Sequence, residues 1–408
     1  MNRRRYLAAL ATASLGVAAG CSSLGGPGAR RDGGDGTTAT GAGTATRETA
    51  TPTAEPPPTA DISIPVSESD LDRAAPRDAI PAITDPVFGA DWSGVEYEIE
   101  RDDGNVTHTP RLSFEDRVIG VIRDGEPRAY PLKLLDWHEV VNDAFAGPLL
   151  VTYCPVCKSA LVAERTVDGE PAEFGVSGFL YRANLVLYDD RTESLWSQLL
   201  ATAIRGPAAG TELSLVPSTV TSWGRWRAEN GDTTVLLPPP ESDTVLGGVR
   251  YNYNLDVYGR RRRIAERYPD YGPLGGLEWT DERLRRRAVV LGVSVGDEAV
   301  AYPARAVAAE GPIEDEVGGR PIVVAQGPDD SLVAYDRRVR GELLSFADGA
   351  DWHLRAGGST WSVVDGEAAD GPHEGQRLTR IEGARQLYWA AWLQFNPETV
   401  VFGRDDGA

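Results

Sequence analysis

Two cysteines with two residues between them, Cys154 and Cys157 in YCPVCKS, are the residues of this 408-residue chain best suited to carry chemistry. Such a pair can form a local disulfide, work as a thiol–disulfide redox couple, hold part of a metal site, or lie inert in a core. The chain has 3 cysteines in all, so any further soft ligand has to come from another residue type.

His138, in DWHEVVND, is the candidate third ligand, and it is one of only 4 histidines. A helix over residues 131–144, followed by a returning strand over 149–153, would bring the His138 turn beside Cys154. His138, Cys154 and Cys157 would form a nitrogen–sulfur set with an open position, which suits a copper or zinc ion. Glu139, or Asp136, is the candidate acid–base residue. The alternative for His138 is an ordinary half-buried helix histidine.

A second cluster of polar residues follows in FGVSGFLYRANLVLYDDRTESLWSQ. Ser177, Tyr181, Asn184 and Gln198 are candidates for lining the same pocket as hydrogen-bonding groups. The alternative is that they satisfy backbone groups of hairpins and turns.

Metal binding is the leading hypothesis, with a thiol–disulfide oxidoreductase and a non-catalytic cell-envelope scaffold held by a local disulfide as the alternatives. A thioredoxin-type pair is expected at a helix N-terminus, which lowers the pKa of the nucleophilic thiol. The residues after Cys157 alternate like a strand, which disfavours that arrangement. The sequence has no P-loop or dinucleotide fingerprint, so no nucleotide cofactor is expected.

The elements that position these residues are mainly strands. Apolar segments around Asp124-Gly125 and Asp168-Gly169 predict two β-hairpins, because Asp-Gly favours a tight two-residue turn. The apolar run LLVTY, at residues 149–153, predicts a buried strand that leads into the cysteines. The predicted fold class is α+β, mainly antiparallel β with a few helices.

An imperfect internal repeat predicts two copies of one fold. GVIRDGEPRAYPLKLL at Gly120 matches GVSVGDEAVAYPARAV at Gly292, and the later pairs Trp223–Trp389 and Trp226–Trp392 also align. The second copy has no cysteine. Where the first copy has His138 and Cys154, the second has Glu310 and Gln326, which favours a single functional site, in the first copy.

The predicted organisation has five parts. Residues 1–20 form an export and lipoprotein signal, 21–74 a flexible Thr/Gly/Pro-rich tether, 75–240 the first repeat with the His/CxxC site, 241–283 a connector, and 284–408 a second, degenerate repeat. Twin arginines and the small residues before Cys21 predict export, lipidation at Cys21 and a lipid anchor on the outer face of the cell membrane.

The net charge of −20, with Lys133 and Lys158 the only lysines, fits a protein of a high-salt environment. The same charge excludes nucleic acid as an expected partner, because no basic stripe is present to neutralise phosphates. Whether the partner is a small molecule or a protein is not indicated.

The segments AYP, DWHEVVND, VTYCPVCKSALV and SLWSQ resemble an uncharacterised bacterial and archaeal family known as domain of unknown function 3179. The resemblance covers about residues 75–405 and implies an exported or lipid-anchored protein, with no established activity. Family members usually have a small residue where this chain has Lys158.

Overall fold

A computed structural model of the protein describes residues 62–102, 104–244, 250–259 and 280–403. The predicted signal, the predicted lipidation site Cys21 and most of the predicted tether lie outside the described residues. The described part consists mainly of antiparallel sheets, with four α-helices, which confirms the predicted class. No helix in these ranges is long and apolar enough to cross a membrane.

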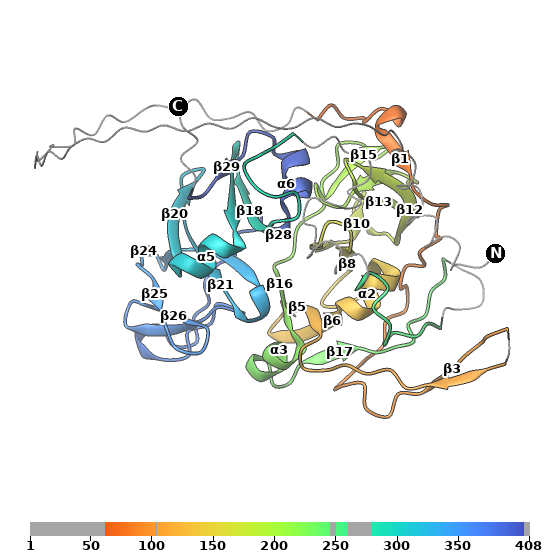
Figure 1. Ribbon diagram of the computed structural model, residues 1–408, viewed down its shortest axis with the longest axis horizontal. Helices are drawn as coiled ribbons and strands as arrows, with labels where there is room; N and C mark the ends of the chain where they lie inside the picture. The colour runs from red at the N-terminus through yellow and green to blue at the C-terminus, as the bar shows by residue number, and fades with distance from the viewer. Residues whose placement is uncertain (1–61, 103, 245–249, 260–279, 404–408) are drawn as a thin grey trace, which may run out of the picture.

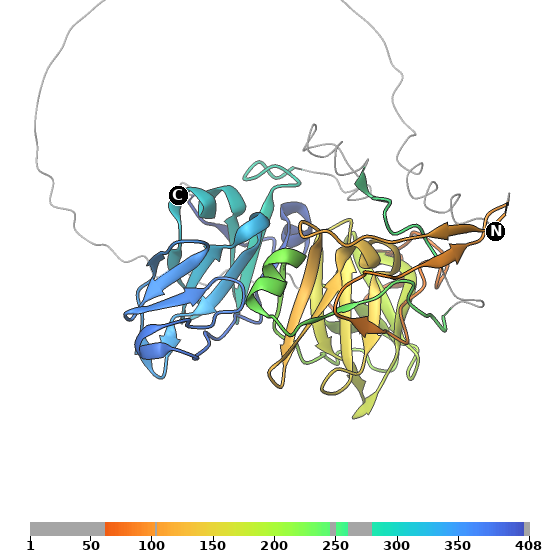
Figure 2. The ribbon, with the colours of Figure 1, turned by 90° about the horizontal axis from the view of Figure 1, so that it is seen from below.

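The chain folds into two halves that lie side by side (Figures 1 and 2). The first half, coloured orange to green, contains the strands up to β17, and the second half, teal to blue, begins at β18.

The strands and helices of the first half are short, and most strands belong to sheets of three or five strands. They are β1 (Leu71–Arg73), β2 (Phe88–Gly89), β3 (Tyr97–Ile99), β4 (Val106–His108), β5 (Arg117–Arg123), β6 (Glu126–Pro131), α2 (Leu132–His138), β7 (Val140–Asp143), β8 (Leu149–Cys154), β9 (Ser159–Glu164), β10 (Thr166–Val167), β11 (Glu170–Pro171), β12 (Phe174–Tyr181), β13 (Asn184–Asp189), β14 (Leu195–Ser197), β15 (Thr202–Arg205), β16 (Ser218–Ser222), α3 (Trp223–Glu229) and β17 (Thr234–Leu236).

The second half is built in the same way, with one four-stranded sheet and several smaller ones. Its elements are β18 (Val289–Val295), β19 (Glu298–Pro303), α5 (Ala304–Glu310), β20 (Ile313–Val317), β21 (Arg320–Gln326), β22 (Leu332–Asp336), β23 (Arg338–Val339), β24 (Glu342–Leu343), β25 (Ala347–Asp348), β26 (His353–Ala356), β27 (Ser359–Ser362), β28 (Arg385–Tyr388), α6 (Trp389–Phe395) and β29 (Val400–Val401).

Both predicted Asp-Gly hairpins are confirmed. β5 pairs with β6 around Asp124-Gly125, and β10 pairs with β11 around Asp168-Gly169. All four turn residues have positive φ, between 51° and 81°. This is the backbone that a two-residue type I′ turn requires, and aspartate and glycine adopt it at low cost.

The predicted helix over residues 131–144 is wrong at its C-terminal end. α2 ends at His138, Glu139 adopts a left-handed conformation (φ 61°), and β7 follows at once. The β-branched Val140 and Val141 favour a strand, and both are fully buried against neighbouring strands. The apolar spacing that suggested a longer helix therefore comes from a short helix followed by a strand.

Each half has a sheet with the same strand order and pairing. In the first half β16, β5 and β6 are antiparallel and β17 joins β6 in parallel; in the second half β28, β18, β19 and β29 repeat that pattern. In both sheets a glycine lies under a helix tryptophan. A Cβ at Gly120 would lie 2.3 Å from the ring of Trp226, and one at Gly292 would lie 2.3 Å from that of Trp392.

The sheet β7-β8-β9 lies between two hydrophobic cores of the first half. All six residues of β8 are buried, and they alternate between the cores as strand geometry requires. Val151 and Tyr153 belong to one core, while Leu150 and Cys154 belong to the other. That second core continues into the second half through α6 and β28. Cys154 therefore lies where both halves pack together.

The folded part of the chain begins before residue 75, the predicted start of the first repeat. β1 pairs with β12, and the side chains of Val66 and Leu71 are buried in the core that contains Cys154. The predicted tether therefore extends too far: its last residues, from about 62 onward, belong to the fold.

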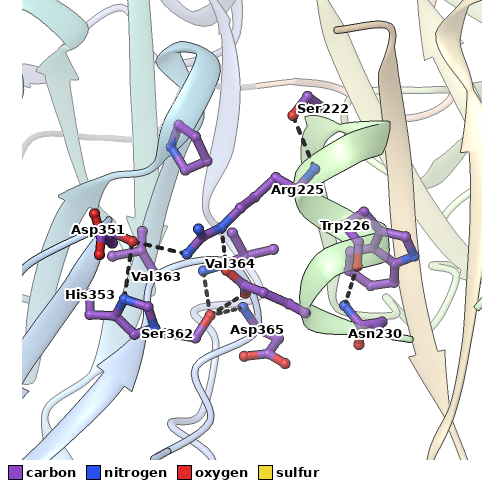
Figure 3. Close-up of polar contacts among 12 residues, drawn as sticks. Ser222, Arg225, Trp226, Asn230, Asp351, His353, Ser362, Val363, Val364 and Asp365 are labelled. Carbon is purple, nitrogen blue, oxygen red and sulfur yellow. Dashed lines mark hydrogen bonds and ion pairs between the residues drawn. The ribbon is translucent and has the colours of Figure 1, made fainter. Parts of the chain in front are cut away.

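Polar contacts also join α3 of the first half to the second half (Figure 3). The guanidinium of Arg225 donates to the carbonyl of Asp351 at 3.1 Å, and it pairs with the carboxylate of Glu229. Glu229 in turn accepts a hydrogen bond from the Ser362 hydroxyl. Burial raises the pKa of Glu229, so this carboxylate holds its proton more tightly than an exposed glutamate does.

Candidate functional site

The two cysteines lie in the loop that joins β8 to β9. Cys154 is the last residue of β8 and pairs with Ser159, the first of β9, so four residues make the turn. Lys158 closes it in a left-handed conformation (φ 59°). Glycine adopts this conformation freely, which explains why a small residue would suit the position. The strand that was predicted to follow the pair is confirmed, and no helix begins at the cysteines.

Both thiols are free and buried, with 3% of Cys154 and none of Cys157 exposed. The sulfur of Cys157 lies 3.2 Å from the carbonyl oxygen of Ala183. It also lies within hydrogen-bonding reach of the Cys154 sulfur. Because a thiol has one hydrogen, Cys157 donates either to this carbonyl or to Cys154, and ionisation of Cys154 favours the second choice.

The surroundings make the two thiols unequal. The S–H of Cys157 and the backbone N–H groups of Cys157, Leu185 and Val156 stabilise a thiolate at Cys154, and they lower its pKa although burial opposes this. The pKa of Cys157 is raised well above its ordinary value, first because it donates to Cys154 and then because it is buried. Cys154 therefore ionises first.

A buried hydrogen-bond network holds Cys157 from the other side. The amide nitrogen of Asn184 donates to the Cys157 sulfur (3.5 Å) and to the Gln198 side-chain oxygen (3.0 Å), while its oxygen accepts from the backbone N–H of Leu199 (3.0 Å). Gln198 also accepts from the hydroxyl of Ser159 (3.0 Å) and donates to that of Thr152 (3.2 Å). Two of the predicted pocket residues thus form part of the cysteine site.

The other two predicted pocket residues lie elsewhere. The hydroxyl of Ser177 donates to the backbone carbonyl of Val186 (2.6 Å) and accepts from the N–H of Phe179, beside the irregularity in the pairing of β12 with β13. Tyr181 packs edge-on against Phe395 of α6. The contacts of Ser177 match the alternative in which such side chains satisfy backbone groups, whereas Tyr181 packs in the core.

His138 is fully buried, and both nitrogens of its ring have partners outside the cysteine pair. Nδ1 lies 2.8 Å from the carbonyl oxygen of Pro81, and Nε2 lies 2.8 Å from the hydroxyl of Tyr253. Since a carbonyl only accepts, Nδ1 carries a hydrogen. Tyr253 belongs to the predicted connector; Tyr251, Tyr253 and Val257 of this segment pack against the first half, whereas Asp281 and Arg283 contact the second half.

Glu139 influences the cysteine site more directly than His138 does. Its backbone carbonyl accepts from the N–H of Tyr153 (2.9 Å), the residue before Cys154, and its side chain is buried. The negative charge of its carboxylate contributes to the raised pKa of Cys157. Within the ranges the structure describes, no three His, Cys, Asp or Glu side chains come together as a metal-binding group.

The second half covers the cysteine loop. The backbone N–H of Tyr388, in β28, donates to the carbonyl of Cys157 (2.9 Å), and Leu387 and Trp389 join the core around the pair. At the position aligned with Cys154, the second half has Gln326, whose amide donates to Asp330 (3.0 Å).

Two clefts lie beside the loop, and both are lined by Tyr153 and Lys158. One, of about 480 Å³, lies against α2 and the described part of the connector. The other, of about 670 Å³, also includes Pro155 and is completed by the second half. Its basic residues were missed in the sequence, although the run RLRRR at 283–287 stands out in so acidic a chain. They are Arg285, Arg287 and Arg305.

No curated protein and no solved structure shows significant similarity to the chain. The model of the family described as "Protein of unknown function (DUF3179)" matches residues 77–399, a span that contains both halves and the cysteine site. The chain therefore belongs to the DUF3179 family of proteins of unknown function.

Proposed function

We propose that Cys154 and Cys157 form a dithiol–disulfide couple that exchanges with an external thiol or disulfide. The observation that carries this proposal is a pair of adjacent free thiols in unlike surroundings: backbone N–H groups face Cys154, whereas the Ala183 carbonyl and the Asn184 amide contact Cys157. In these surroundings the pKa of Cys154 is lowered and that of Cys157 is raised. Exchange requires one cysteine to attack as a thiolate while the other stays protonated until the mixed disulfide has formed. The surroundings of Cys154 and Cys157 favour this division of roles.

The proposed reaction balances as two exchanges. The Cys154 thiolate attacks one sulfur of a substrate disulfide, forms a mixed disulfide and releases the first substrate thiolate. Cys157 then gives up its proton, which the released thiolate takes, and attacks the Cys154 sulfur. The products are the Cys154–Cys157 disulfide, the first substrate thiol and a second substrate thiolate, which takes a proton from solvent, so two electrons pass from the protein to the substrate. The reverse sequence oxidises a dithiol.

Backbone groups add to the stabilisation of the attacking thiolate that the S–H of Cys157 provides. The N–H groups of Val156, Cys157 and Leu185 are fixed by the hairpin loop and by β13, so they need no rearrangement when Cys154 ionises. Glu139 is a candidate to influence deprotonation of Cys157, because its charge acts on that thiol.

Metal binding by the same pair is the second candidate, and the backbone N–H groups directed at Cys154 favour it, since metal knuckles stabilise thiolates in this way. Cys154 and Cys157 would supply two sulfur ligands to copper or zinc. For His138 to be the third ligand, its ring would have to give up Pro81 or Tyr253. This requirement ranks metal binding below thiol exchange.

The proposed setting is outside the cell, at a lipid anchor on Cys21, where oxidants act on thiols directly. A scaffold with a local disulfide is the non-catalytic alternative.

Fractionation of cells that express wild type or Cys21→Ser tests the anchor: the variant is expected in the soluble fraction, and its retention on membranes would contradict lipidation at Cys21.

Intact-mass measurement after alkylation, with and without reductant, tests the exchange. Oxidised protein is expected to gain two alkyl groups at Cys154 and Cys157 only after reduction, and reduced protein is expected to convert a small disulfide to thiols. Cys154→Ser and Cys157→Ser serve as matched controls. Stoichiometric copper or zinc in protein prepared without chelators, retained in His138→Ala, would instead support the two-sulfur metal site.

A further inference from the structure

The larger cleft beside the cysteine loop has an unusual charge for this protein. Its lining contains four cationic side chains and one carboxylate, that of Asp330, which is a local balance of +3 in a chain of net charge −20. The cations are Lys158, Arg285, Arg287 and Arg305. A concave site lined by one sign of charge concentrates small ions of the opposite sign.

The neighbouring cleft provides an internal comparison. It shares Lys158 and Tyr153, but its lining has three cations and four carboxylates, a balance of −1. One of those cations, Lys133, is paired with Asp116 at 2.5 Å. The basic character therefore belongs to one side of the loop and is not a general property of this region.

Two of the cationic side chains in the larger cleft are exposed. Arg285 and Arg305 are exposed and make no ion pair with any residue in the described ranges. The guanidinium carbon of Arg287 lies 5.6 Å from the ring centre of Tyr388. The carboxylate of Asp330, the one acidic group, accepts a hydrogen bond from Gln326.

The cleft also adjoins the loop that carries the reactive pair, although neither cysteine lines it. Tyr153, Pro155 and Lys158 form its first-half wall, and these residues flank Cys154 and Cys157 in the sequence. The opposite wall belongs to the second half, which includes Tyr388, the residue whose N–H holds the Cys157 carbonyl. A volume of about 670 Å³ is in the range of small-molecule sites.

We propose that this cleft binds the carboxylates of a small anionic disulfide or thiol, the exchange partner of Cys154 and Cys157; the inference rests on the proposed function. Arg285 and Arg305 hold the carboxylates, and the substrate sulfur lies towards the cysteine loop. The Cys154 thiolate attacks that sulfur, one substrate thiolate leaves, and Cys157 displaces the second, with the balance given above. The second half thus supplies the recognition of the substrate, and the first half supplies the sulfur chemistry.

A kinetic experiment tests this specificity. Reduced full-length protein is reacted with 5,5′-dithiobis(2-nitrobenzoate), which is anionic, 4,4′-dithiodipyridine, which is neutral, and cystamine, which is cationic. In Arg285→Gln/Arg305→Gln, the rate with the anionic disulfide is expected to fall about tenfold, the low end of the gain from a focused cationic cleft. The rate with the neutral disulfide is expected to stay within about twofold, since thiol chemistry is untouched.

Arg338→Gln/Arg340→Gln is the matched control, because it removes the same charge from exposed positions away from the cleft. It is expected to leave all three rates unchanged. Equal loss of rate with the anionic and the neutral disulfide in the cleft variant, or the same selective loss in the control, would overturn the inference.

A binding experiment separates the cleft from the redox chemistry. Calorimetry with 3,3′-thiodipropionate, a dicarboxylate that cannot exchange, is carried out on Cys154→Ser/Cys157→Ser. Binding that is lost in the further Arg285→Gln/Arg305→Gln variant supports the cleft even if the wild-type pair never cycles. Absence of binding overturns the cleft, even if the pair exchanges with neutral disulfides.

Discussion

Replacing Cys157 by alanine removes the S–H group that is the first cause of the lowered pKa of Cys154. The three backbone N–H groups remain, so part of the stabilisation of the thiolate survives. A hydrogen bond to a charged group contributes about 1.5–3 kcal/mol. Since about 1.4 kcal/mol corresponds to a factor of ten, the fraction of Cys154 present as thiolate near neutral pH should fall roughly ten- to a hundredfold.

The assay measures the rate at which iodoacetamide alkylates Cys154 as a function of pH, with peptide mapping by mass spectrometry to assign the site. The ultraviolet absorbance of the thiolate gives a second reading that does not depend on access of a reagent to a buried sulfur. Circular dichroism checks that the fold is retained.

Cys157→Ser is the matched control for this substitution, because a serine hydroxyl can also donate to the Cys154 sulfur. It is expected to keep more of the thiolate at neutral pH than Cys157→Ala does. If Cys154 titrates at the same pH in wild type and in Cys157→Ala, Cys157 does not support the thiolate, and the assignment of roles within the pair is refuted.

Three further predictions concern the elements that hold the site. Asn184→Ala leaves the buried N–H of Leu199 without its acceptor, so the free energy of unfolding in urea should fall by about 1–3 kcal/mol. A fall below about 0.5 kcal/mol, the scale of an ordinary surface substitution, would contradict the network. Gly120→Ala places a methyl group against the ring of Trp226 and should destabilise the protein by about 1–3 kcal/mol. Gly231→Ala is the control, because no atom lies within 4 Å of the added Cβ, and it should not destabilise the protein. Equal effects of the two substitutions would refute the close approach of Gly120 to Trp226. Because burial raises the pKa of Glu229 above its ordinary 4.5, the native state binds this proton more tightly, and stability should decline as pH rises from about that value through the raised pKa. Glu229→Gln removes this decline, so parallel curves of melting temperature against pH for the two proteins would show that Glu229 does not titrate in this way.

Local patterns in the sequence predicted the strands around the site well. Asp-Gly dipeptides located both hairpins, and the apolar run before Cys154 located β8, because turn geometry and side-chain alternation act over a few residues. The boundary between α2 and β7 was mispredicted, since apolar residues of a short helix and of the next strand happened to fall at helical spacing.

The partners of the candidate residues could not be predicted in the same way. His138 contacts Pro81 and Tyr253, which are 57 and 115 positions away in the sequence. Arg285 and Arg305 reach the cysteine loop only because the second half packs against the first. Contacts of this kind depend on tertiary packing, which no local pattern of residue types encodes.

The most direct test of the account is a redox titration of the cysteine pair. The full-length protein is equilibrated with graded ratios of reduced and oxidised dithiothreitol, quenched with acid, alkylated and weighed by mass spectrometry. We expect one two-electron transition in which Cys154 and Cys157 lose alkylation together, and which is absent in Cys154→Ser. A pair that stays in one state across all ratios would contradict it.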